Sequence, residues 1–99
     1  MGETPVSRDI DENTALRAGE QVFAREFDGE LVLLDLGRGE YFGLNATGAL
    51  LWRRSADGRS VGQVAEEASR LYNVPKEETL SDMLALAREL CSMGLLVPT

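Results

Sequence analysis

The side chains that most often carry out catalysis or bind metals are scarce in this sequence. It contains no histidine, which is the commonest general base and metal ligand of proteins. The one cysteine, Cys91, cannot build a zinc site of the usual four-ligand kind. Cys91 also falls on the apolar stripe of a predicted helix, so we expect a buried and unreactive thiol.

Two other patterns resemble binding sites but lack essential parts. The acidic run between Asp9 and Glu12 has too few oxygen ligands for a calcium loop and no glycine bend, so a solvated segment is the better interpretation. The glycines at 37, 39 and 43 are spaced somewhat like a phosphate-binding loop, but they join two predicted strands rather than a strand and a helix. We therefore predict no catalytic group, no metal site and no cofactor, and a protein that is not an enzyme.

Size and charge narrow the class of protein further. A chain of 99 residues with 43% hydrophobic side chains is expected to form one globular domain. The formal charge of −7 argues against binding to nucleic acid or to an anionic membrane surface. No apolar run approaches the roughly 20 residues that cross a bilayer. The start of the chain lacks the apolar middle of a signal peptide, and a single cysteine excludes an internal disulfide, which favours the cytoplasm.

The chain divides into a polar start and a patterned remainder. Residues 1–20 contain few large apolar side chains and predict a mobile arm, with order expected at most near Leu16. Residues 21–99 are predicted to form the folded domain.

The first part of that domain has the pattern of an antiparallel sheet. Asp28-Gly29 is a strong hairpin signal, because both residues tolerate the positive φ of a type I′ turn. The run 30–36 is apolar on both alternating faces, which suits a central strand covered on both sides. The last strand then lies at an edge with unpaired backbone groups. The expected strands are 21–27, 30–36 and 41–44.

Helical signals follow directly. Asn45 is a natural N-cap, and Ser60 with Gln63 matches a capping box. Gly94 is expected to end the last helix, after which residues 95–97 return to the core. The expected helices are 46–56, 60–72 and 76–93. A three-stranded antiparallel sheet followed by three helices is an α+β domain.

The third helix has a wider apolar sector than one packing face requires. Leu86 and Met93 extend the expected stripe on one flank, beside Met83 and Leu90. Methionine adapts to variable partners because its thioether side chain is flexible. The sector is consistent with the wall of a binding groove, and equally with a small helical cluster that buries a wide face.

One further pattern runs along most of the chain and consists of Val32-Leu33-Leu34-Asp35, Gly39, a central motif from Tyr41 to Gly48, Trp52, Val61, Ala65, Tyr72-Asn73-Val74 and Gly94-Leu95-Leu96. This pattern resembles the PqqD-like family, whose members recognise precursor peptides that are made on the ribosome and then modified. The similarity covers about Val22 to Val97. The sequence departs from the family pattern at Arg54 and Ser55, where leucines are common, and it lacks a Pro-Glu pair of the quinone-cofactor member. Its closing Gly-Leu-Leu-Val-Pro is similar to stand-alone lasso-peptide recognition proteins.

The resemblance implies a winged helix-turn-helix fold and a peptide partner. In relatives, the leader segment of the precursor peptide adds as a strand to the third strand and lies against the third helix. An adaptor of this kind would deliver the peptide to a modifying enzyme or a leader peptidase. The resemblance and the apolar flank together predict these peptide-binding residues, with Arg88 meeting an acidic leader residue: Tyr41, Phe42, Gly43, Met83, Leu86, Arg88, Leu90 and Met93.

Two other functions remain as alternatives. A DNA-binding winged helix would place the third helix in the major groove, but the first half of that helix offers Lys76 beside Glu77, Glu78 and Asp82. A structural subunit of an enzyme complex would use the apolar flank as a protein interface.

Overall fold

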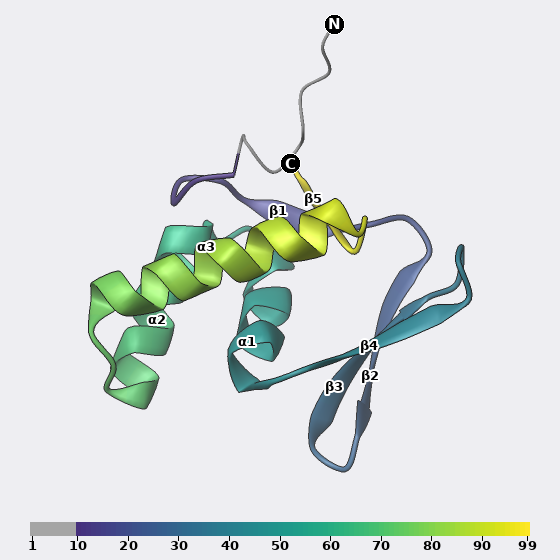
Figure 1. The fold of residues 1–99 in the computed structure, drawn as a ribbon, viewed down its shortest axis with the longest axis horizontal. Helices are drawn as coiled ribbons and strands as arrows, with labels where there is room; N and C mark the ends of the chain where they lie inside the picture. Colours follow the sequence, from purple (N-terminus) through teal and green to yellow (C-terminus); the bar gives the residue numbers. More distant parts are fainter. Residues whose placement is uncertain (1–9) are drawn as a thin grey trace, which may run out of the picture.

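The structure is a computed structural model that describes residues 10–99. The predicted α+β class is confirmed, with three helices and two antiparallel sheets in this part of the chain. Figure 1 shows α3 lying across α1 and α2, while the larger sheet extends to one side of the helices. The start of the predicted arm, including Asp9 of the acidic run, lies outside the described residues.

The larger sheet consists of β2 (Val22–Phe27), β3 (Glu30–Asp35) and β4 (Glu40–Leu44), in that spatial order. Asp28 and Gly29 both adopt positive φ, at 52° and 82°, so the expected tight hairpin is confirmed. The next turn is held by the buried Asp35, whose Oδ1 accepts hydrogen bonds from the backbone N–H groups of Gly37 and Arg38. This turn fixes the start of β4 against the end of β3.

The helices are α1 (Ala46–Ser55), α2 (Val61–Tyr72) and α3 (Lys76–Ser92). Each begins where the sequence predicts. The Asn45 side chain accepts a hydrogen bond from the Gly48 N–H, and Ser60 forms the complete capping box with Gln63. Pro75 precedes α3, and Gly94, with a φ of 75°, follows its end.

A second sheet joins the two ends of the described chain, and the sequence does not predict it. β1 (Leu16–Ala18) pairs antiparallel with β5 (Leu96–Pro98). Ile10 and Leu16 are each 1% exposed, so the segment before β2 belongs to the core. The expectation of a mobile arm is therefore wrong from residue 10 to residue 20. Its few apolar side chains find partners only across the whole length of the chain, which a local pattern does not reveal.

The core lies between the helices and one face of the larger sheet. Leu31, Leu33 and Leu44 are buried on the face that meets α1. Val32 and Leu34 point to the other face and stay partly exposed, while Leu36 is 63% exposed. The prediction that this strand is covered on both sides is thus wrong, because α1 packs on one face of the sheet and no helix covers the other face within residues 10–99 (Figure 1).

The two departures from the family pattern have polar partners. Arg54 Nε donates to Glu67 Oε1 at 2.9 Å, and its Nη2 donates to Oε2 at 3.0 Å, which links α1 to α2. The buried Ser55 hydroxyl donates to the carbonyl of Leu51 at 2.6 Å. The first contact therefore connects α1 to α2, and the second lies within α1.

Candidate functional site

One edge of the larger sheet is open in the part of the chain that the structure describes. β4 pairs with β3 and has no strand on its other side. Alternate residues of such an edge direct their N–H and C=O groups outward. Gly43 is exposed on this strand, and a Cβ atom built there meets no atom within 4 Å. A further extended chain can therefore approach β4 closely.

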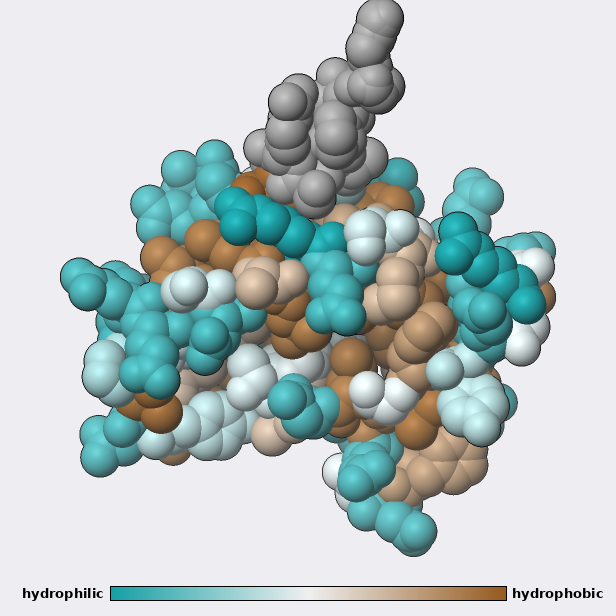
Figure 2. Space-filling model, viewed as in Figure 1, coloured by the Kyte–Doolittle hydropathy of each residue, from teal (hydrophilic) through white to brown (hydrophobic). Residues whose placement is uncertain are grey.

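A cleft of about 210 Å³ lies between this edge and the C-terminal half of α3. Leu90 is 2% exposed and forms its floor, while Leu86 and Met93 are partly exposed. Figure 2 shows apolar side chains gathered between α3 and the sheet on this face of the molecule. Most of the predicted peptide-binding residues line this cleft. Its lining is Phe42, Gly43, Leu44, Asn45, Leu86, Glu89, Leu90 and Met93.

A second cleft, of about 390 Å³, continues from the first along the N-terminal half of α3. The two share Asn45 and Leu86, so we treat them as one surface and call it the α3 groove. The second cleft has more polar side chains in its lining than the first. Its lining is Asn45, Thr47, Ala68, Tyr72, Val74, Thr79, Asp82 and Leu86.

Several groove residues were not predicted as site residues. Asn45 and Thr47 belong to the central motif, and their place at the corner between β4 and α1 is the signal that would have identified them. Tyr72 follows the apolar period of α2 and reads as core from its spacing, but its side chain is 46% exposed. Asp82 and Glu89 lie one turn from Leu86 on either side, so their helical spacing alone predicts that they flank it.

Two of the predicted site residues lie elsewhere, and a third, which was predicted for the pairing edge, has only its backbone there. Met83 is 0% exposed and belongs to the core, because it lies on the side of α3 that faces the other helices. Arg88 donates from Nη2 to the backbone carbonyl of Ile10 at 3.0 Å, so it anchors the start of the described chain. Tyr41 is 75% exposed and points away from the groove, although its backbone belongs to the open edge.

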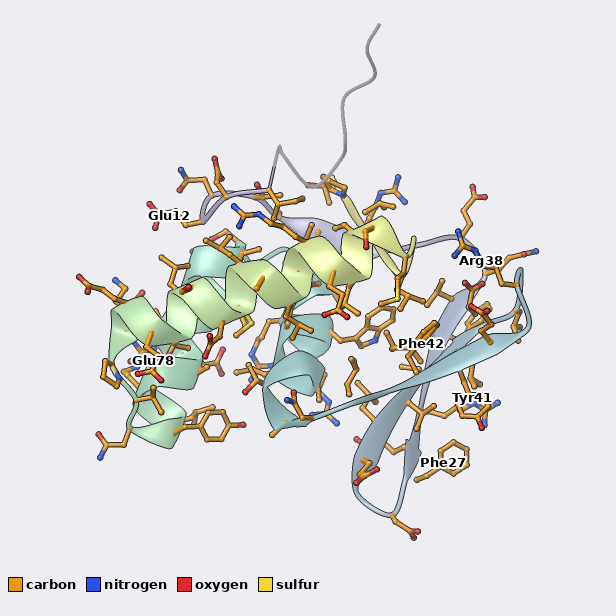
Figure 3. All side chains as sticks on the ribbon, in the orientation of Figure 1. Glu12, Phe27, Arg38, Tyr41, Phe42 and Glu78 are labelled. Carbon is orange, nitrogen blue, oxygen red and sulfur yellow. The ribbon has the colours of Figure 1, made fainter. Side chains whose placement is uncertain are left out.

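The side chain of Tyr41 lies on a second apolar surface. Phe23, Leu34 and Tyr41 are aligned by register across the three strands, and Phe27 lies farther along the same face. Phe23 and Phe27 are 53% and 57% exposed. Figure 3 shows Phe27 and Tyr41 on the far side of the sheet from the helices, and Phe42 on the near side. We call this surface the outer sheet face.

Neither the cysteine nor the acidic side chains of the described residues form a metal-binding group. Cys91 is 7% exposed, and burial raises the pKa of its thiol, so the expected unreactive cysteine is confirmed as buried. No group of three or more acidic or cysteine side chains could hold a metal ion within residues 10–99. No helix in this range combines the length and the hydrophobicity needed to span a membrane.

Comparison with known proteins identifies the family. A family model described as coenzyme PQQ synthesis protein D (PqqD) matches residues 30–96. A solved lasso peptide synthetase B1 complexed with the leader peptide is 34% identical, with a TM-score of 0.78, covering 84% of this chain and 98% of its own. TbiB1 in complex with the TbiA(beta) leader peptide is 29% identical, with a TM-score of 0.74, covering 81% of this chain and 93% of its own. No curated protein gives a match. The family match spans well over half of the sequence and includes β4 and α3, and the chain therefore belongs to the PqqD family.

Proposed function

We propose that this protein is a non-catalytic adaptor that binds the leader segment of a ribosomally made precursor peptide. The leader adds as a strand to β4 and places side chains in the α3 groove. The adaptor then delivers the peptide to a modifying enzyme or a leader peptidase. The observation that carries the proposal is the coincidence of an open strand edge with an apolar cleft beside it. The two similar solved structures, both named as leader-peptide complexes, support it.

The backbone of β4 and the side chains of the groove contribute to peptide binding in different ways. The outward N–H and C=O groups of β4 supply hydrogen bonds that any peptide sequence can make. The groove supplies selectivity, because alternate side chains of an added strand face α3 and enter the pocket beside Leu86 and Met93.

We also propose that the arrangement is a winged helix-turn-helix used for peptide recognition. In this interpretation α2 and α3 form the helix pair, and the β3–β4 hairpin forms the wing. DNA binding is disfavoured by charge, because the first turn of α3 carries Glu77 and Glu78, and Lys76 lies 4.0 Å from the Glu66 carboxylate. A cytoplasmic location remains a prediction.

The outer sheet face is the surface we assign to the partner enzyme. Its exposed aromatic side chains lie on the opposite side of the sheet from the groove, so enzyme and leader can bind at the same time. An adaptor of this kind would also have the structural role considered as an alternative, because the same protein would both hold the peptide and contact the enzyme.

Titration of isotope-labelled protein tests the proposal. The probe is a synthetic leader peptide of the kind named in the two similar solved complexes. Amide shifts are expected along β4 and the groove-facing half of α3, with none at the β1–β5 sheet. Shifts confined to β2 or to residues 10–20 would contradict strand addition to β4.

A further inference from the structure

The charged side chains that line the α3 groove all have the same sign. Of the residues that line its two clefts, the charged ones are Asp82 and Glu89, and within the described range no Lys or Arg is among them. Both carboxylates are exposed, and neither forms an ion pair within residues 10–99. The groove therefore presents unneutralised negative charge beside apolar surface.

The two carboxylates bracket the apolar centre of the groove. Asp82 precedes Leu86 by four residues and Glu89 follows it by three, so all three side chains share one face of α3. At about 1.5 Å per residue, Asp82 and Glu89 lie about 10 Å apart along the helix axis. An extended chain rises about 3.3 Å per residue, so about three residues of a bound peptide cover this distance.

We infer that the α3 groove selects a leader segment in which a Lys or Arg lies two residues from a large apolar side chain, because side chains two apart on a strand point to the same face. The apolar side chain enters the cleft beside Leu86, Leu90 and Met93, and the cation faces Asp82 or Glu89. This inference rests on the proposed function and names the class of its ligand. It replaces the sequence-based expectation of an acidic leader residue at Arg88, since that guanidinium is engaged by the Ile10 carbonyl.

The charges have a kinetic as well as an energetic consequence. Opposite charges near a binding groove accelerate encounter and improve selectivity more than they raise affinity. The Debye length is about 8 Å at physiological ionic strength, so these exposed carboxylates act on a peptide only close to the groove. Binding should therefore weaken as salt is added, and the weakening should disappear when both carboxylates are neutralised.

Selection from a randomised library of twelve-residue displayed peptides tests the inference on the intact chain. The wild type should enrich peptides with an apolar anchor and a Lys or Arg two positions away. The double variant Asp82→Asn/Glu89→Gln should still enrich the anchor but lose the preference for a cation. Its affinity for a selected wild-type peptide should fall about two- to fivefold, as expected for one exposed ion pair.

The matched control neutralises two carboxylates of the same helix outside the groove. Glu77→Gln/Glu78→Gln changes the net charge equally, and Figure 3 shows Glu78 at the opposite end of α3 from Phe42. This control should keep the enrichment of cations. Equal loss in both double variants would attribute the preference to net charge and overturn the inference.

The outcomes separate the inference from the proposed function. Enrichment of an apolar anchor without any cation, with amide shifts along β4, would overturn the charge inference and leave leader binding intact. Failure to enrich any peptide that shifts the β4 amides would instead contradict strand addition itself. Enrichment of Asp or Glu beside the anchor would show that the groove prefers a negatively charged peptide and would overturn the inference.

Discussion

The Asn45 side-chain oxygen accepts a hydrogen bond from the backbone N–H of Gly48 at 2.8 Å, and this bond fixes the corner between β4 and α1. The corner matters for binding, because Asn45 lines both clefts of the α3 groove. Gly48 is buried beneath it, and a Cβ there would come within 3.2 Å of Leu44. One N-cap therefore sets both the end of the open edge and the start of the groove.

Removal of this cap should affect stability in a defined way. Asn45→Ala leaves the Gly48 N–H without its partner and should lower the free energy of unfolding by about 1 kcal/mol. Asn45→Asp keeps an acceptor oxygen at the same place and serves as the control, with stability near that of the wild type. Urea denaturation monitored by circular dichroism measures both. Equal stability of all three proteins would show that the cap does not hold the corner.

Leu86 should contribute to peptide binding rather than to folding. It lines both clefts and is partly exposed, so Leu86→Asn removes apolar contact from the groove without adding charge. We expect leader binding to weaken by about 1–3 kcal/mol, because a polar amide is placed in a partly apolar site. Fluorescence anisotropy with a labelled synthetic leader gives the affinity, and a thermal melt should show a folded domain.

Met83 provides the contrasting variant on the same helix. Its side chain is fully buried, so Met83→Ala should lower the free energy of unfolding by about 2–5 kcal/mol through the cavity that it leaves. If Met83→Ala instead weakened leader binding by more than its loss of stability explains, Met83 would be a groove residue. Loss of folding in Leu86→Asn would assign Leu86 to the core.

Local patterns predict most of the fold but only part of the site. The turn at Asp28 and Gly29 and the caps at Asn45 and Ser60 depend on neighbours within a few residues, and each prediction is confirmed. The pairing of β1 with β5 joins segments about eighty residues apart, for which one sequence carries no local signal. Helical spacing likewise locates Leu86 and Met83 on one apolar sector without stating which of them faces the core.

Strand addition predicts a period of two in the backbone contacts of the leader. An added strand directs the N–H groups of alternate residues toward β4, and the residues between them direct theirs away. N-methylation at single positions of a synthetic leader should therefore weaken binding at every second position over about four or five residues. Affinity measured across this set of peptides reveals the alternation. Uniform tolerance of methylation, or a period of three to four, would indicate a helical or irregular peptide.

Arg88 should influence the attachment of the N-terminal segment and not the groove. The guanidinium donates to the carbonyl of Ile10, whose side chain is buried in the core. Arg88→Ala should increase hydrogen exchange near residue 10 and leave the affinity for the leader within about twofold. Lys at this position keeps a donor and is the conservative control. A large loss of affinity in Arg88→Ala for leaders with acidic residues would restore the original expectation that Arg88 binds the peptide.

The Arg54–Glu67 pair predicts how stability depends on pH. The hydrogen bond from Arg54 lowers the pKa of the Glu67 carboxyl below its ordinary value of 4.5. A carboxyl with a lowered folded-state pKa stabilises the fold above its unfolded pKa, and this contribution is lost as the pH falls through the folded value. The wild type should therefore lose stability below about pH 4.5 through this group, in the direction of increasing acid. In Arg54→Gln the Glu67 titration, followed by NMR of its side-chain carboxyl, should move to higher pH, and the acid dependence of urea unfolding should become shallower. An unchanged Glu67 midpoint in that variant would show that the link between α1 and α2 does not persist in solution.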